Sequence, residues 1–358
     1  MNKRYLLAMI LTLALCVGLL GGCAQETPSQ SNGESGNSSA ATYNWRFAVS
    51  EGTESVQAYW ATTFVDKLKE LNPNINIEIF YGGQLGDAVE CNEMCINGLL
   101  EFVTADPANM SSFIPEMQCF ALHFFWPNDD AVVDDVLANS DAIKETVSDL
   151  YAEKGLTLLA MHNLGWDLWT SNRPLQKVSD FSGLKVRVMQ SPMIIHSYEL
   201  YGANPTPIAF SETYSALQLG TADAQENPAQ SIVEAKFYEV QDYLTLSRHA
   251  IMPGAIAVNS SLFDTLPAEI QDQIKEAADY AQSVFAEGRE KIDSAKLQEM
   301  QDKSDITVME LDDAARSEFA AAAEPAIDYY ISEYGGERGR ALVEELKSDI
   351  EEAEARLG

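Results

Sequence analysis

Basic residues are scarce in this chain. Lys and Arg number 23 against 55 Asp and Glu, which gives a formal net charge of −32 over 358 residues. A nucleic-acid-binding surface needs clustered positive charge, so this composition argues against nucleic acid as a partner. It leaves room for a small anionic ligand. The field of exposed charges fades over about 8–10 Å at physiological salt, and one buried Arg can dominate its own pocket.

Histidine is rarer still, and no known catalytic or cofactor motif is present. The four His residues are far apart in the sequence, and there is no H-E-x-x-H, no G-x-S-x-G, no phosphate loop and no dinucleotide fingerprint. A triad assembled from distant residues stays open. We interpret each His as a structural hydrogen-bonding residue, and we expect no catalytic residue, no cofactor and no resident metal.

Cysteine is too sparse for a disulfide framework. Outside the N-terminal 23 residues only Cys91, Cys95 and Cys119 remain, an odd number that allows one bridge plus a free thiol. Cys91 and Cys95 are four residues apart and would share a helix face. No His or further Cys lies at metal-finger spacing, so small buried apolar residues are the favoured interpretation.

Only one long apolar run occurs, at the N-terminus. Lys3 and Arg4 precede a nearly uninterrupted apolar stretch over 6–20. This order is typical of a secretory signal, and the run is short of the roughly 20 residues that span a bilayer. The following Leu-Gly-Gly-Cys23 resembles a bacterial lipobox, which implies a diacylglyceryl group on Cys23. Two acyl chains would give stable anchoring where one is marginal. A chance Cys after a signal peptide, or an uncleaved anchor, stays open.

Residues 24–42 are rich in Ser, Asn, Gln, Gly and Glu and contain no aromatic residue. Such a segment cannot bury enough apolar surface to offset its ordering entropy. We predict that this segment is a flexible tether. Together with the signal sequence and a lipidated Cys23, it would leave the folded body outside the cytoplasm and anchored to a membrane.

The sequence beyond residue 42 has a pattern of strands and helices that predicts an α/β fold. Alternating strands at 45–49 and 75–79 and a short strand at 102–105 are separated by helical patterns at 55–71 and 87–97, a rhythm that favours a mostly parallel sheet. A second α/β region follows, with strands at 184–188, 242–247 and 255–259 and helices at 191–202 and 211–219.

A long helical pattern runs from Pro267 to about Asp302, and a break near Gly288 is the alternative. Roughly 35 helical residues would span about 50 Å, more than one small domain, so we predict two lobes with a ligand cleft between them. The predicted organisation is a signal peptide over 1–22, a tether over 23–42, lobe I over 43–164 plus about 253–292, lobe II over 165–252 plus about 293–346, and a C-terminal helical tail over 347–358.

The stretch 183–249 contains a dense series of motifs. It reads G-L-K-V-R-V, then G-A-N-P-T-P-I-A-F-S-E-T-Y-S-A-L-Q, then Q-E-N-P and K-F-Y-E-V-Q-D-Y-L. In these motifs the chain closely resembles the C4-dicarboxylate-binding (DctP) type of solute-binding subunits of TRAP (tripartite ATP-independent periplasmic) transporters. The resemblance covers essentially all of 43–345. It implies a two-lobed periplasmic-binding-protein-like fold with a mixed sheet in each lobe. It also implies a carboxylate ligand, two membrane permease subunits as partners, and closure about a hinge.

The resemblance also implies site residues. Arg187, in the G-L-K-x-R motif, would bind the ligand carboxylate, since a guanidinium matches a carboxylate bidentately. Asn227 would contribute a ligand-contacting amide, Phe210 an aromatic pocket wall, and Asp106 a polar residue after the third strand. From the residues alone, Arg187 could be a structural ion pair or a surface charge, Asn227 a turn residue before Pro, and Phe210 a core-packing residue.

One position departs from the family pattern. Many members carry a second Arg in a G-x-R motif, where this chain has Gly165-Trp166-Asp167. The missing cation puts dicarboxylates in doubt. We expect a monocarboxylate with an aromatic or hydroxylated body, with Trp166 as aromatic surface and Asp167 accepting a hydroxyl or amine if it faces the pocket. A ligand sensor for a signalling partner and an extracellular enzyme are the alternatives to a transport receptor.

Overall fold

The computed structural model describes residues 41–358, which form one compact unit. The predicted signal peptide, the lipidation site at Cys23 and nearly all of the predicted tether therefore lie outside the described residues. Within 41–358, no helix combines the length and apolar character needed to cross a membrane.

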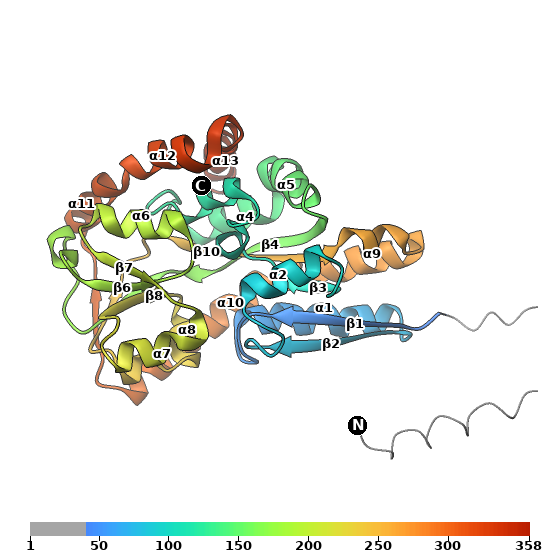
Figure 1. Ribbon diagram of the computed structural model, residues 1–358, viewed down its shortest axis with the longest axis horizontal. Coiled ribbons are helices and arrows are strands. Elements are labelled where there is room, and N and C mark those ends of the chain that lie inside the picture. Colours follow the sequence, from blue (N-terminus) through green and yellow to red (C-terminus); the bar gives the residue numbers. More distant parts are fainter. Residues whose placement is uncertain (1–40) are drawn as a thin grey trace, which may run out of the picture. The chain divides into compact units, whose positions relative to one another are not determined.

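Two separate mixed sheets form the framework (Figure 1). In the first, β1 pairs in parallel with β2 and β3, while β10 pairs antiparallel with β3 and β4. Its order is β2 (Ile75–Tyr81), β1 (Tyr43–Val49), β3 (Phe102–Thr104), β10 (Ile251–Asn259), β4 (Leu156–Trp166). The first three strands are parallel, as predicted, and the two later strands make the whole sheet mixed.

The second sheet has parallel pairs on both sides of a central antiparallel strand. β6 pairs in parallel with β7 and β8, β9 with β11, and β5 runs antiparallel between β8 and β9. Its order is β11 (Thr307–Glu310), β9 (Tyr243–Leu246), β5 (Leu168–Ser171), β8 (Ala224–Asn227), β6 (Lys185–Val188), β7 (Asn204–Pro207).

Helices cover both sheets. The α-helices are α1 (Val56–Leu71), α2 (Ala88–Ile96), α3 (Pro107–Met110), α4 (Asp130–Asn139), α5 (Ser148–Ala152), α6 (Pro192–Leu200), α7 (Phe210–Gln218), α8 (Ala229–Glu234), α9 (Ser260–Thr265), α10 (Ala268–Lys303), α11 (Asp313–Ala323), α12 (Pro325–Tyr330) and α13 (Gly336–Leu357). Short 3₁₀ or π segments lie at Pro115–Ala121, Ala142–Val147, Val178–Phe181, Phe237–Glu239 and Ile331–Gly335. The predicted tail over 347–358 is the last part of α13.

The chain crosses between the sheets three times. It passes from β4 to β5 through the single residue Asp167, returns from β9 to β10 through 247–250, and crosses again along α10 to β11. The first two crossings lie side by side, since Trp166 pairs with Ile251 and Trp169 with Thr245. Asp167 therefore sits where a hinge between the sheets would be.

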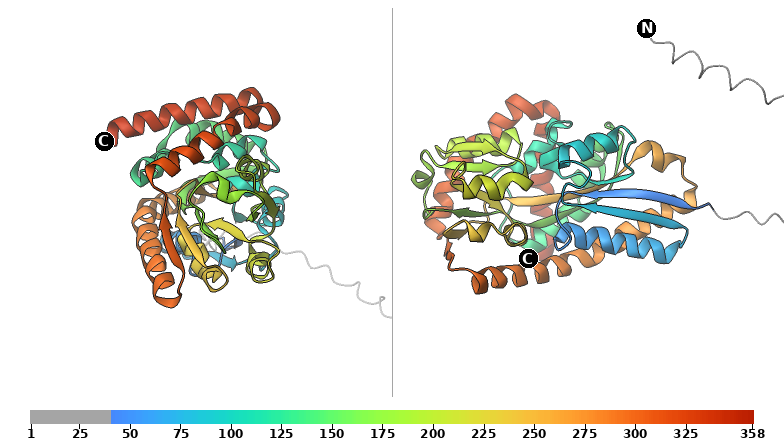
Figure 2. Two further views of the ribbon diagram at one scale, coloured as in Figure 1. Left: turned by 90° about the vertical axis from the view of Figure 1, so that its left-hand side faces the viewer. Right: turned by 60° about the horizontal axis from the view of Figure 1, so that its bottom comes forward.

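Helix α10 is one continuous helix of 36 residues, about 54 Å long. It packs against α1 beside the first sheet and α8 beside the second, and Figure 2 shows it running past both. The break considered at Gly288 does not occur. A Cβ at Gly288 would lie 2.2 Å from the ring of Tyr59, so this glycine permits close packing rather than ending the helix.

Candidate functional site

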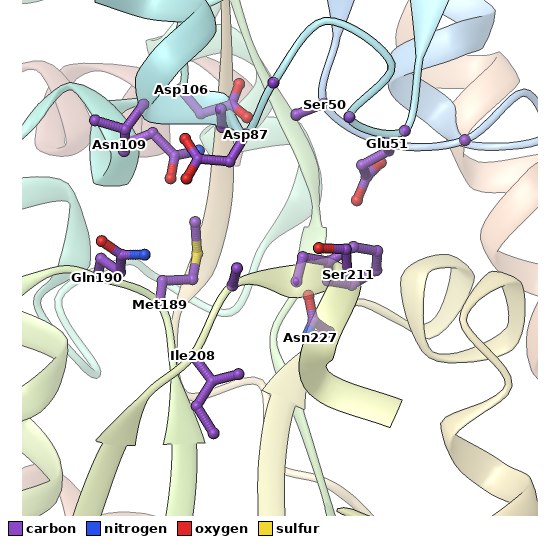
Figure 3. A pocket seen from close by; sticks show the side chains of 18 of the residues that line it. Ser50, Glu51, Asp87, Asp106, Asn109, Met189, Gln190, Ile208, Ser211 and Asn227 are labelled. Carbon is purple, nitrogen blue, oxygen red and sulfur yellow. The ribbon is translucent and has the colours of Figure 1, made fainter. Parts of the chain in front are cut away.

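A cavity of about 240 Å³ lies between the two sheets. Most of its lining residues lie at or just after the carboxyl ends of β1, β2, β3, β6, β7 and β8, and Met252 comes from β10. In α/β sheets ligands bind beyond the carboxyl ends of parallel strands, where loops and helix starts converge. Figure 3 shows Glu51, Asp87 and Asp106 on one wall, facing Met189, Gln190 and Asn227 on the other.

Arg187 is positioned in this cavity by the alternation of β6. Val186 and Val188 are fully buried on one face of the strand, and Arg187 points from the other face into the cavity wall with 2% exposure. Its Nε donates to the Ile208 carbonyl at 2.9 Å, whereas the buried Nη1 has no hydrogen-bond partner. No carboxylate of residues 41–358 lies within ion-pair distance of it, and although burial lowers its pKa to about 10 the side chain stays charged at neutral pH.

Two further predicted residues line the same cavity. Asn227 ends β8 and is buried, with its Nδ2 donating to Gln225 Oε1 at 2.5 Å. Phe210 begins α7, is half-buried and packs edge-on against Phe237 at 5.7 Å between ring centroids. The structure thus brings Arg187, Asn227 and Phe210 onto one surface, as the motifs predicted, while their contacts with a ligand stay predictions.

The facing wall is acidic. Asp106 follows β3, and both its carboxylate oxygens are occupied, by the Gln57 side chain at 2.7 Å and the Ala255 backbone N–H at 3.1 Å. Glu51 follows β1 and differs. Its Oε1 accepts from Ser231 at 2.7 Å, but its Oε2 is buried without a partner. Burial raises the pKa of Glu51 to about 8 and that of Asp106 to about 7.

A smaller cavity of about 30 Å³ lies behind the first and shares Asp106, Met189 and Met252 with it. Asp167 lines this rear cavity together with His123 and Glu226. Burial, reinforced by the charge of Glu226, raises the pKa of Asp167 well above its usual value. Asp167 therefore lines the rear cavity and not the main one, and its predicted contact with the ligand stays a prediction.

Trp166 is not brought to either cavity. Its side chain is buried, and its Nε1 donates to Asp130 Oδ1 at 3.2 Å. Alternation along the chain at the β4–β5 crossing directs Trp166 and Asp167 to different surroundings. The prediction that Trp166 contributes aromatic surface to the ligand pocket therefore has no support from the geometry.

The four His residues do not all stay apart. His123 and His249 meet with ring centroids 4.6 Å apart, and His249 Nε2 lies 2.8 Å from Glu226 Oε2. This cluster, like Glu51, was missed from the sequence, where 126 residues separate the two His. The only available signal for Glu51 is that it directly follows the first strand, as Asp106 follows the third.

The three cysteines of the body are buried, free thiols, so the possible bridge is not formed. Burial raises the pKa of Cys91 to about 11 and that of Cys95 to about 12. Cys91 and Cys95 lie on the buried face of α2, in keeping with the role of small apolar residues.

Comparison with known proteins identifies the family. The pattern of the bacterial extracellular solute-binding proteins, family 7 (DctP), matches residues 47–333. The ectoine/5-hydroxyectoine-binding periplasmic protein UehA of Ruegeria pomeroyi is 33% identical over 86% of this chain and 90% of its own length. The ectoine-binding periplasmic protein TeaA of Halomonas elongata is 32% identical, with the same coverage.

Solved structures agree. The periplasmic ectoine-binding protein of the Halomonas elongata TeaABC TRAP transporter superposes with a TM-score of 0.84 at 32% identity, over 86% of this chain and 99% of that one. The sugar-acid-binding protein DctPAm of Advenella mimigardefordensis, in complex with galactonate, superposes with a TM-score of 0.81 at 26% identity, over 86% and 99%. The predicted two-lobed fold, with a mixed sheet in each lobe, is confirmed.

Proposed function

The chain belongs to family 7 of the bacterial extracellular solute-binding proteins and serves as the solute-binding component of a TRAP transporter, and we propose that its cleft captures a small zwitterionic monocarboxylate. The proposal rests on one observation. The main cavity holds an unpaired buried donor, Arg187 Nη1, and an unpaired buried acceptor, Glu51 Oε2, on walls contributed by the two sheets.

Each of these atoms is costly to leave unpaired, because burial removes it from water. A carboxylate beside Arg187 and a cationic N–H group beside Glu51 would satisfy both at once. Arg187 is the only Lys or Arg on the wall of the main cavity, which also bears three acids, Glu51, Asp87 and Asp106. One carboxylate is therefore matched by positive charge, whereas a second would face acids.

Ectoine has this chemistry, since it joins one carboxylate to a cationic cyclic amidine. Two relatives that this chain matches over most of their length are named for binding it. Phe210 offers a ring against the flat face of such a ligand. Asn227 offers its carbonyl oxygen to an N–H group, because its Nδ2 already donates to Gln225.

A sugar acid is the second candidate. With pKa values near 8 and 7, Glu51 and Asp106 are largely or partly protonated at neutral pH and could exchange hydrogen bonds with hydroxyl groups, as could Asp167 behind them. A relative with a matching fold is solved in complex with galactonate. In this case too, Arg187 would bind the carboxylate.

Calorimetric titration with ectoine, 5-hydroxyectoine, galactonate and succinate tests the proposal. We expect the tightest binding from a zwitterion, and binding of every carboxylate to weaken by ~100-fold or more in Arg187→Ala, which removes charge-assisted bonds of about 1.5–3 kcal/mol each. Lys185→Ala is the matched control, because Lys185 lies on the same strand, half-exposed and paired with Asp223. Tightest binding of succinate, or an unchanged affinity in Arg187→Ala, would overturn the proposal.

We further propose that the two sheets and their helices act as lobes that close about the paired strand crossings, delivering ligand to two membrane permease subunits. The protein would release its ligand chemically unchanged. Recovery of an altered ligand after prolonged incubation would instead support an extracellular enzyme, and gene neighbours encoding a signalling receptor rather than a permease would support a sensor.

The lipid anchor at Cys23 is proposed from the sequence alone. It would hold the protein on the outer face of the cytoplasmic membrane or on the periplasmic side. In cells given a labelled fatty acid, the wild-type protein should carry label and Cys23→Ser should not. Equal labelling of the two would remove the proposal.

A further inference from the structure

Three metal-ligating side chains converge behind the ligand cavity. His123 comes from the segment after 115–121, Glu226 from β8 and His249 from the β9–β10 crossing. Glu226 Oε2 lies 2.8 Å from His249 Nε2 and 3.9 Å from His123 Nε2, and all three atoms lie within 4.8 Å of one another. Bonds of about 2.0–2.2 Å to a metal place neighbouring ligand atoms roughly 3 Å apart, which these separations bracket.

The hydrogen bonds around His249 direct a lone pair into the cluster. The Ser247 hydroxyl lies 3.2 Å from the Asp167 carbonyl oxygen, to which it can donate, and 2.7 Å from His249 Nδ1. When its single hydrogen is donated to Asp167, the Ser247 oxygen accepts from His249 Nδ1–H. That tautomer leaves His249 Nε2 without a hydrogen. Two acceptors, Nε2 and Glu226 Oε2, then face each other at 2.8 Å, an arrangement that requires a proton or a cation between them.

Tyr198 does not supply this proton, so either the carboxyl group of Glu226 carries it or a cation takes its place. Tyr198 accepts from Trp169 Nε1 at 2.8 Å and gives its own hydroxyl hydrogen to Glu226. On the other side, His123 is oriented through Nδ1, which lies 3.0 Å from the Tyr201 hydroxyl, so its Nε2 is turned toward Glu226. Metal-binding His residues characteristically have the second ring nitrogen held by such an outer partner.

The cluster also has an open side. His123 and Glu226 line the rear cavity of about 30 Å³, which has room for about two water molecules. Three protein ligands with one open position is the arrangement of exchangeable and catalytic zinc sites. Asp167, on the same wall, could hold a metal-bound water.

We propose that His123, Glu226 and His249 form a binding site for a divalent transition-metal ion of the zinc class at the rear of the cleft. Two imidazoles and one carboxylate suit ions that favour nitrogen ligands over Ca²⁺ or Mg²⁺. The site goes beyond organic-ligand capture and does not depend on it.

The charge balance accommodates the ion. Two positive charges would be matched by Glu226 and Asp167, leaving Arg187 and Glu51 to the organic ligand. The ion would also place positive charge in the region of the G-W-D segment, where the family's second Arg is missing. Its presence would therefore extend the ligand range toward acids with a second oxygen that reaches the rear cavity.

Titration of chelator-treated protein with Zn²⁺ and with Co²⁺ at pH 7.5, without organic ligand, tests the site. We expect one ion per chain, and visible absorption bands of nitrogen-ligated Co²⁺. Glu226→Gln and His123→Leu should each weaken binding by ~100-fold or more. Glu226→Gln keeps the side-chain shape, so it remains informative if His123→Leu folds poorly.

His162→Leu is the matched control, because His162 is equally buried, with a pKa lowered by burial to about 3, but lies outside the cluster. Zn²⁺ affinity should be unchanged in this variant. Binding that is equal in wild type and Glu226→Gln would assign the ion to the many surface carboxylates and overturn the proposal. So would Co²⁺ binding without nitrogen-ligand absorption. Either result leaves organic-ligand binding by Arg187 intact.

Discussion

Glu51 is the residue whose chemistry depends most on what the cleft contains. In the free protein one carboxylate oxygen has no partner, and burial raises its pKa to about 8. Opposite charge beside a carboxyl group lowers its pKa. A cationic ligand would therefore drive Glu51 toward the ionised form and release the proton it holds near pH 7.

This release distinguishes zwitterionic from purely anionic ligands. At pH 7 we expect wild-type protein to release up to one proton per ectoine bound, and Glu51→Gln to release much less and to bind ectoine at least ~10-fold more weakly. Calorimetry in two buffers of different ionisation enthalpy measures the proton count. Galactonate provides the comparison, with little effect expected. Proton release that is the same in Glu51→Gln and wild type would show that another group supplies it.

At the residue scale, a site residue could be predicted when its position depends on the sequence immediately around it. Arg187 was predictable because a strand alternation and a dense motif surround it. Glu51 lies in Ser50-Glu51-Gly52, which has the composition of a turn. In the folded protein Glu51 is buried, and its carboxylate accepts a hydrogen bond from the hydroxyl of Ser231, 180 residues away along the chain. The His123–Glu226–His249 cluster likewise depends on three segments that only the tertiary fold brings together.

At the element scale, strands β1, β2, β3, β6 and β9 and helices α1, α2, α6, α7 and α10 were predicted within a few residues. Helices α4, α11 and α12 and strands β5, β7, β8 and β11 were not predicted. β7 is Asn-Pro-Thr-Pro, and two prolines argue against a strand except at a sheet edge, which is where β7 lies. β8 is Ala-Gln-Glu-Asn, fully buried despite its polarity. Its three polar side chains are held by hydrogen bonds to other buried side chains, among them Thr170 and His249.

Helix α10 is attached to α4 by a buried cation. Arg289 donates to Asp130 at 3.1 Å and to Asp134 at 2.8 Å, and its side chain is only 6% exposed. Asp293, one turn on, lies 3.8 Å away. Three carboxylates thus share one guanidinium beside the strand crossings, because Asp130 also accepts from Trp166.

Removing that guanidinium leaves the partly exposed carboxylates of Asp134 and Asp293 without a counter-charge, so Arg289→Gln should destabilise the protein by about 1–3 kcal/mol. A urea unfolding curve measures the loss as a lowered midpoint. Lys291→Gln, on the same helix but in an exposed pair with Glu287, should leave the midpoint unchanged. Equal midpoints for Arg289→Gln and wild type would mean that the ion pairs of Arg289 do not stabilise the fold.

At the scale of the whole molecule, the charge is distributed unevenly between surface and interior. Most of the acidic residues in 41–358 are at least partly exposed to water, but Glu51, Asp106 and Asp293 have pKa values raised by burial to about 8, 7 and 7. Two of these line the ligand cavity and the third lies beside the strand crossings. The functional region is therefore also where ionisation opposes folding.

A specific pH dependence of stability follows. A carboxyl whose pKa is higher in the folded than in the unfolded chain stabilises the fold below its unfolded pKa, and that contribution is lost as pH rises through the folded value. Between pH 6 and pH 8 these three groups lose protons in the folded state while their unfolded counterparts are already ionised. The free energy of unfolding of the ligand-free protein should therefore fall as pH rises from 6 to 8.

Urea unfolding at half-unit pH steps measures this slope, which the triple variant Glu51→Gln, Asp106→Asn, Asp293→Asn should flatten. The buried His123, His162 and His249, whose pKa values burial lowers to about 3, oppose this slope near pH 6, so the comparison with the triple variant decides the matter. Equal slopes in the two proteins would show that the three carboxyls do not carry the effect. An ectoine-saturated sample should lose the part of the slope due to Glu51.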